Sequence, residues 1–199
     1  RDAAWVLCPP AGGPLGPFRM LSTLLIEVFQ ARVVPMSATE HDAVAALASH
    51  IPHLLAGSLA GAVARSSLRD AILNLAAGSF RDGTRVAGTP SARTVDMLLN
   101  NRDFVLQQIG LVEGFLADLI AALREGDREM LATHYAQSRG VREDLSRPAT
   151  SFTRVFPIDD PPQAELDFLL ELGRRGGGLT ACVVEKSTVT YTVRQPRSR

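Results

Sequence analysis

The residues most able to do chemistry begin with a short polar segment, Ser49-His50-Ile51-Pro52-His53. His50 and His53 are three positions apart, so in a helix they lie on the same face. A neutral imidazole can both donate and accept a hydrogen bond, which suits a polar substrate pocket. The same spacing also occurs in ordinary helix histidines, and without neighbouring acidic or thiol ligands it is a weak signal for zinc. The segment leaves both roles open and predicts no metal site.

A second polar segment, Phe80-Arg81-Asp82-Gly83-Thr84-Arg85-Val86-Ala87, places an arginine on either side of an acid. The planar guanidinium group of Arg pairs bidentately with carboxylates. Asp82 could orient a histidine or hold an arginine. The alternative is a solvated loop whose local ion pair contributes little stability. The residue types therefore favour an anion-binding loop or a simple surface loop.

Long helices must position these two segments. Apolar residues at helical spacing predict a helix from about residue 39 to 77, closed by Gly78 and interrupted at Pro52, which cannot continue a regular helix. Residues 79–90 are polar and contain glycine, so they predict a loop. Ser91 is a suitable N-cap for the next helix, which we expect to run to about Glu125.

The helix predicted over residues 91–125 is apolar on two sides. One stripe comprises Leu98, Val105, Ile109, Val112, Leu116, Leu119 and Leu123, and a second set comprises Phe104, Leu111, Phe115 and Ile120. A helix that is apolar on more than one side is usually buried on more than one side. One side can face its own core, and the other predicts contact with a second subunit, hence a homodimer.

Both ends of the chain predict β-structure. Near the start, the pattern predicts a buried strand at 5–10, a helix at 18–30 and a strand at 31–36, which is typical of the last βαβ unit of a parallel sheet. Such a unit cannot bury its own faces and implies a larger sheet upstream. The tail predicts a strand at 153–158, a helix at 161–174 and strands at 179–185 and 189–193. This βαββ order is too small to be stable alone.

Composition excludes some classes of function. The 21 basic and 21 acidic residues balance, which argues against a nucleic-acid binder. The sequence contains no run of about 18 apolar residues, so it predicts no membrane span. It also shows no signal-peptide pattern. We therefore expect a cytoplasmic protein without a membrane partner. The chain starts at Arg1 without an initiator methionine, so we interpret it as part of a longer protein.

Together the polar segments resemble the prephenate dehydrogenase family. That family carries approximately the patterns EHD, SHxPH, FRDxTRIA and a helix containing NR. Here the corresponding segments, in the same order, are Glu40-His41-Asp42, Ser49 to His53, Phe80 to Ala87 and Asn101-Arg102. The resemblance covers about residues 1 to 130. One departure is Thr94, which stands where many members carry Trp.

The resemblance implies a mainly α fold with three parts. Residues 1–36 would end a Rossmann-type α/β domain, residues 37–145 would form an all-helical substrate-binding and dimerisation domain, and residues 150–199 would be a βαββ appendage. In its βαββ order the appendage is similar to part of an ACT-type regulatory module, although Asp159-Asp160-Pro161-Pro162 lacks the usual glycine.

The resemblance also assigns site residues. Ser49, His50 and His53 would line the substrate pocket, Arg85 would bind a carboxylate of prephenate or arogenate, and Asp82 would support the histidines. The family's catalytic histidine lies upstream, so no catalytic residue is expected in this chain.

The cofactor, NAD or NADP, would likewise be bound mainly by the upstream domain, because no G-x-G-x-x-G follows a strand here. The implied reaction is oxidative decarboxylation of prephenate in tyrosine biosynthesis, with tyrosine as a candidate inhibitor, and the chain alone would be inactive. The alternative is a non-catalytic truncated paralogue that dimerises or senses an aromatic amino acid.

Overall fold

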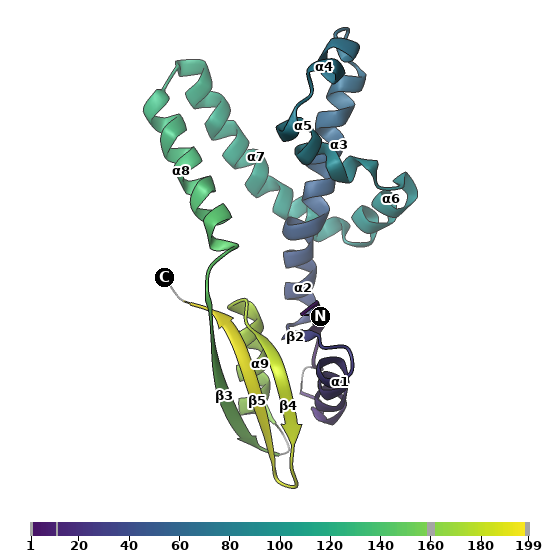
Figure 1. Ribbon diagram of the computed structural model, residues 1–199, viewed down its shortest axis with the longest axis vertical. Coiled ribbons are helices and arrows are strands. Elements are labelled where there is room, and N and C mark those ends of the chain that lie inside the picture. The colour runs from purple at the N-terminus through teal and green to yellow at the C-terminus, as the bar shows by residue number, and fades with distance from the viewer. Residues whose placement is uncertain (1, 11, 159–161, 198–199) are drawn as a thin grey trace. The chain divides into compact units, whose positions relative to one another are not determined.

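The computed structural model describes residues 2–10, 12–158 and 162–197, which fold into two compact units (Figure 1). The sheet unit comprises Arg1–His41 and Ala132–Arg199, and the helical unit comprises Asp42–Leu131. The chain is mostly helical and contains one small mixed sheet among the described residues. The predicted Asp159-Asp160-Pro161 corner of the tail lies outside the described residues.

The sheet unit contains both predicted β-segments. Its elements are β1 (Ala4–Leu7), α1 (Gly16–Glu27), β2 (Arg32–Pro35), β3 (Ala149–Pro157), α9 (Gln163–Arg174), β4 (Gly178–Val184) and β5 (Thr188–Pro196). Two further helices cross the boundary between the units, α2 (Ala38–Ala45) and α8 (Arg128–Asp144). The βαβ and βαββ orders predicted from the sequence are both present.

The five strands form one sheet in the order β1-β2-β4-β5-β3. β1 and β2 are parallel, and the other neighbours are antiparallel. The pairing of Val33 in β2 with Leu179 in β4 joins the start of the chain to its tail. Residues 1–36 and 150–199, which the sequence pattern treats as separate parts, therefore share a sheet. Local periodicity cannot reveal this pairing because it reports which residues form strands and not which strands meet.

One hydrophobic core holds this unit together, and α1 and α9 both pack against the sheet through it. Its buried members are Leu15, Phe18, Leu25, Ala31, Val33, Phe156, Leu166, Leu169, Leu172, Leu179, Cys182, Val189, Tyr191 and Val193. Gly173 allows α9 to approach β2 closely, since a Cβ atom there would stand 1.6 Å from the backbone oxygen of Pro35. The tail is thus part of the same packed body as the βαβ segment.

A buried polar cluster links three elements of this core. Arg19 in α1 donates to Glu165 in α9 through Nε at 3.0 Å and through Nη2 at 2.5 Å. The hydroxyl of Tyr191 in β5 donates to the same carboxylate at 2.5 Å. Burial raises the pKa of Tyr191, and the hydrogen bond to Glu165 raises it further, so the phenol stays protonated as the donor. Both charges of the Arg19–Glu165 pair thus have hydrogen-bond partners inside the core, which offsets the free-energy cost of burying them.

The first strand differs from the prediction. The sequence predicts a buried strand at 5–10, but β1 ends at Leu7 and Trp5 is 48% exposed. Within the described residues β1 pairs only with β2, at the edge of the sheet. The Trp5 ring lies beside Phe29, with centroids 6.4 Å apart. An apolar strand sequence predicts burial only when both faces of the strand are covered.

The helical unit continues from α2 through a series of short and long helices. They are a π-helical turn η1 (Ala46–His50), α3 (Ile51–Ala64), α4 (Arg69–Leu75), α5 (Gly78–Thr84), a 3₁₀ turn η2 (Arg85–Gly88), α6 (Ser91–Asn100) and α7 (Arg102–Glu125). The prediction that Gly78 closes a helix and that 79–90 is a loop is wrong, because Gly78 begins α5. Both α5 and η2 pack against α3, and this packing outweighs the poor helix propensity of the glycines.

The helix predicted over 91–125 is divided in two at Asn101. The second part, α7, ends at Glu125 as predicted, and Gly126 after it adopts a left-handed conformation with φ of 68°.

The apolar faces of α7 remain largely uncovered within one chain. Leu111 is 64% exposed, Leu116 49% and Leu123 69%, while Val105 is buried. By length and composition alone, two helical stretches, Ala38–Ala64 and Arg102–Glu125, are apolar enough to cross a membrane. That is weak evidence for a span, since a helix that packs against another protein surface passes the same test.

Candidate substrate site

A π-helical turn positions the histidine segment. The Ile51 N–H bonds to the carbonyl of Ala46, five residues earlier. Pro52 explains the irregularity, because it has no N–H and its ring clashes with the carbonyl four residues before it in a regular α-helix. The chain therefore widens by one residue over Ala46–His50 and resumes as α3 at Ile51, as the interruption at Pro52 predicts. Such turns are frequent at functional sites.

His53 is held at both ring nitrogens. Nδ1 lies 3.0 Å from the backbone oxygen of Ser49, and Nε2 lies 3.4 Å from the hydroxyl of Thr89. A carbonyl oxygen can only accept, so Nδ1 carries the hydrogen and Nε2 accepts from Thr89. Thr89 directly follows η2, whose packing on α3 brings the two residues together.

His50 is positioned from a different direction. Its Nδ1 lies 3.2 Å from the side-chain nitrogen of Asn101, at the corner between α6 and α7. The same amide nitrogen donates to the backbone oxygen of Asp42 at 2.8 Å. Asn101 thus connects the end of the π turn to α2, a role that the sequence motif did not reveal.

Two of the other predicted site residues, Asp82 and Arg85, make no hydrogen bond to the histidines in the described part of the chain. Asp82 in α5 and Arg85 in η2 are exposed, and their side chains form no hydrogen bond or ion pair within the described part of the chain. Ser49 is also exposed and contributes its backbone oxygen. The structure therefore groups Ser49 with His53 and leaves Arg85 available for an external anion.

A cavity of about 390 Å³ lies at the Asn101 corner, and another of about 480 Å³ lies beside His53. The second is lined also by Arg65, Thr94 and Leu98. A volume of this size fits a small organic substrate. Thr94, the position at which the sequence departs from the family pattern, therefore borders the cavity. Sequence reasoning missed Arg65, although His53, Gly57, Gly61 and Arg65 are spaced four residues apart along α3, which is a recognisable signal.

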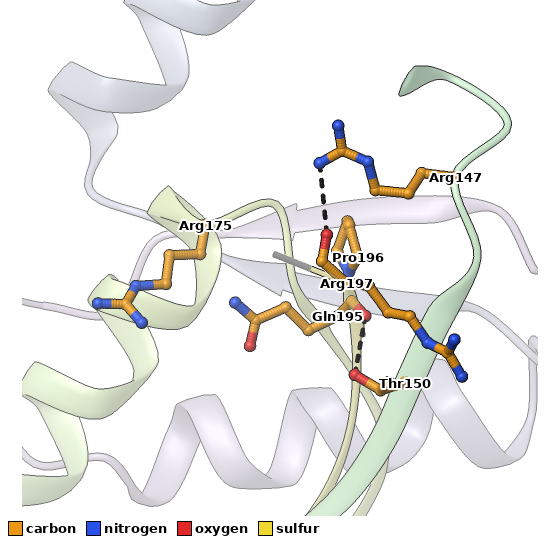
Figure 2. Close-up of a pocket in the computed structure, with 6 residues that line it drawn as sticks. All are labelled: Arg147, Thr150, Arg175, Gln195, Pro196 and Arg197. Carbon is orange, nitrogen blue, oxygen red and sulfur yellow. Dashed lines mark hydrogen bonds between the residues drawn. The ribbon is translucent and has the colours of Figure 1, made fainter. Parts of the chain in front are cut away.

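A larger cavity lies in the sheet unit and does not form a convergent site. It measures about 700 Å³ and is lined in the sheet unit by Arg147, Arg175 and Arg197 (Figure 2). The three guanidinium groups point in different directions in Figure 2. Arg147 is already paired with Asp144 and Arg175 with Glu171. The substrate site is better sought at the histidines.

Glu40, the first residue of the EHD segment, has a structural role. Its carboxylate accepts from the Ser37 hydroxyl at 2.7 Å and from Arg174 Nη2 at 2.6 Å. The Ser37 hydrogen bond, followed by the Arg174 contact, lowers the pKa of Glu40. This residue caps α2 and joins it to α9, and it is not part of the histidine cluster.

Two solved structures share the fold of this chain. One is Synechocystis arogenate dehydrogenase, with a TM-score of 0.68 and 24% identity over 72% of this chain and 52% of that one. Another is prephenate dehydrogenase from A. aeolicus in complex with hydroxyphenyl propionate and NAD+, with a TM-score of 0.64 and 22% identity over 72% of this chain and 50% of that one. The fold of this chain therefore matches about half of each of these two chains.

Sequence comparison identifies the family. The family model described as prephenate dehydrogenase, dimerization domain, matches residues 37–137. Cyclohexadienyl dehydrogenase of Zymomonas mobilis is 33% identical over 147 residues, which are 71% of this chain and 49% of that protein. The chain belongs to the prephenate dehydrogenase family, as the motifs indicated, and spans about half the length of this curated relative.

The connection from β1 to α1 is poorly suited to hold the pyrophosphate of a dinucleotide. The connection from β1 to α1 contains Pro9, Pro10 and Pro14, and Pro17 stands in the first turn of α1. Proline has no N–H, so this connection offers few donors to a pyrophosphate. Among the described residues no group of three or more His, Cys, Asp and Glu side chains is arranged to hold a metal ion.

Proposed function

We propose that this chain is the C-terminal part of a prephenate dehydrogenase. The complete subunit would carry out the oxidative decarboxylation of prephenate to 4-hydroxyphenylpyruvate in tyrosine biosynthesis, with NAD or NADP as the hydride acceptor. The observation that carries the proposal is the cavity beside His53, which lies within the segment that matches the family model. We also propose that the enzyme acts in the cytoplasm.

The residues of this chain would bind and orient the substrate. Prephenate is a dianion, so its carboxylates need cationic partners and hydrogen-bond donors in a site that excludes water. Arg85 is exposed and can supply a bidentate guanidinium. His50 and His53 would supply polar contacts from the π turn and α3, with Ser49 and Asp82 at the edge of the site. The base that removes the hydroxyl proton would come from the upstream domain.

The test is a kinetic assay of the full-length subunit with prephenate and, separately, arogenate. Formation of NADH or NADPH together with 4-hydroxyphenylpyruvate supports the proposal. Turnover of arogenate alone would replace the proposed substrate with its amino analogue. No turnover of either compound by a folded, cofactor-binding subunit would overturn the proposed function.

The 199-residue chain by itself should not reduce a nicotinamide cofactor with prephenate. The reason is that no G-x-G-x-x-G pattern follows a strand in its sequence and that the prolines of the β1–α1 connection leave few donors there. The measurement is absorbance at 340 nm with purified chain, prephenate and either cofactor. Turnover that co-purifies with the chain and is lost in an Arg85→Ala variant would contradict this prediction.

We propose that the exposed apolar faces of α7 form a homodimer interface, which the family's dimerization domain supports. Leu111→Glu should weaken the dimer by about a hundredfold, because a carboxylate would be buried without a partner. Ala117→Glu is the matched control, since it adds the same charge at an exposed position on the side of the helix that carries Glu113 and Arg124. Sedimentation or light scattering measures both, and equal behaviour of the two variants would rule out this face.

A further inference from the structure

The hydrogen bonds at the corner between α6 and α7 determine how the amide of Asn101 is oriented. Its side-chain nitrogen lies 2.8 Å from the backbone oxygen of Asp42. A carbonyl oxygen has no hydrogen to give, so the atom facing it must be the NH₂ group and not the amide oxygen. The orientation of Asn101 is therefore set by a group outside the histidine segment.

The second hydrogen of the same NH₂ group faces His50. The distance from this nitrogen to His50 Nδ1 is 3.2 Å, which is a hydrogen-bond distance. Because the amide nitrogen donates, Nδ1 must be the acceptor and carries no hydrogen. In a neutral imidazole the single hydrogen is then on Nε2.

We infer that Asn101 is a positioning residue that holds His50 in the tautomer with its hydrogen on Nε2. His53 is held in the opposite tautomer, because its Nδ1 donates to the Ser49 oxygen and its Nε2 faces the Thr89 hydroxyl. The two histidines of the segment therefore differ in which ring nitrogen carries the hydrogen, Nε2 in His50 and Nδ1 in His53.

The tautomer assigns a chemical role to His50 within the proposed site. A ring with the hydrogen on Nε2 can donate from that atom to an oxygen of an anionic or carbonyl-bearing substrate. It cannot at the same time accept a proton there, so a substrate oxygen that reaches this atom meets a donor and not the general base. This role rests on the proposed function, whereas the tautomer itself does not.

Nuclear magnetic resonance of the 199-residue chain tests the tautomer directly. Long-range ¹H–¹⁵N correlations distinguish the two ring nitrogens, and the chain has only four histidines to assign. At alkaline pH, we expect His50 to show the Nε2–H pattern and His53 the Nδ1–H pattern. A native His50 that carries its hydrogen on Nδ1 would overturn the inference.

Variants at the corner provide the sharper test. Asn101→Asp replaces the donor with an acceptor, so His50 should reverse to the Nδ1–H pattern. Asn100→Asp places the same charge one residue away at an exposed position and should leave the pattern unchanged. Asn101→Ala removes the donor without adding charge and should give an average of both tautomers. An unchanged His53 pattern shows that each variant is folded, and an unchanged His50 pattern in Asn101→Asp contradicts the inference.

Kinetics of the full-length subunit separate this inference from the proposed function. If Asn101→Asp reverses the tautomer, we expect the KM for prephenate to rise about tenfold relative to Asn100→Asp, the loss of one hydrogen bond to a charged group. If the native subunit does not turn over prephenate but the tautomer reverses, only the proposed function fails. If prephenate is turned over and the tautomer does not respond, only the role of Asn101 fails.

Discussion

Replacing Arg85 with alanine in the full-length subunit should raise the KM for prephenate by about two orders of magnitude or more. A desolvated carboxylate needs a paired charge, and the guanidinium fork supplies charge and orientation together. Hydrogen bonds to charged groups contribute about 1.5–3 kcal/mol each, so the loss of a bidentate pair amounts to at least a hundredfold in affinity. Arg85 is exposed and unpaired within the described part of the chain, so its removal should cost the fold little.

Three further variants sharpen this test. Arg85→Lys should restore binding only in part, because an ammonium is a point charge without the fork. Arg81→Ala is the matched control, since Arg81 is also exposed and lies one helical turn earlier in α5. His53→Ala should cost less than Arg85→Ala because a neutral imidazole contributes one hydrogen bond. A near-normal KM for Arg85→Ala in steady-state kinetics would show that Arg85 is a surface residue.

Glu165→Gln should lower the free energy of unfolding of the sheet unit by about 3–5 kcal/mol, the usual cost of removing one partner from a buried ion pair. Glu165 and Arg19 have side-chain exposures of 2% and 8%, so solvent cannot compensate the charge that remains. The glutamine amide would also direct its own N–H groups toward the donors of Arg19. Since Arg19 lies in α1 and Glu165 in α9, the loss should loosen the tail from the βαβ segment.

The matched control for this prediction is Glu171→Gln in the same helix. Glu171 pairs with Arg175 on the surface at 2.6 Å, and exposed pairs of this kind contribute about 0–1 kcal/mol. Trp5 is the only tryptophan and lies in the sheet unit, so its fluorescence during urea unfolding reports on this unit. If the two variants unfold within about 1 kcal/mol of each other, the buried cluster does not anchor the tail.

The sequence by itself determined the family and the local structure around the histidine segment, although not around the arginine segment, where it predicted a loop. The spacing of Ser49, His50 and His53 and the irregularity at Pro52 are local properties, and the structure has the π turn and the start of α3 there. The strand and helix order at both ends of the chain was predictable for the same reason, because hydrophobic periodicity over a few residues reports secondary structure. The break at Gly126 likewise follows from one residue type that tolerates positive φ.

Only the tertiary structure decided which distant residues meet. The pairing of β2 with β4 and the buried cluster of Arg19, Glu165 and Tyr191 join the two ends of the chain, and no local pattern encodes such contacts. The helix over 78–84 forms because it packs on α3, against the propensity of its glycines. The contact between Asn101 and His50 arises in the same way, because the corner between α6 and α7 packs against the π turn. Secondary structure is largely a short-range property, whereas the protonation and orientation of a side chain depend on whatever the fold places beside it.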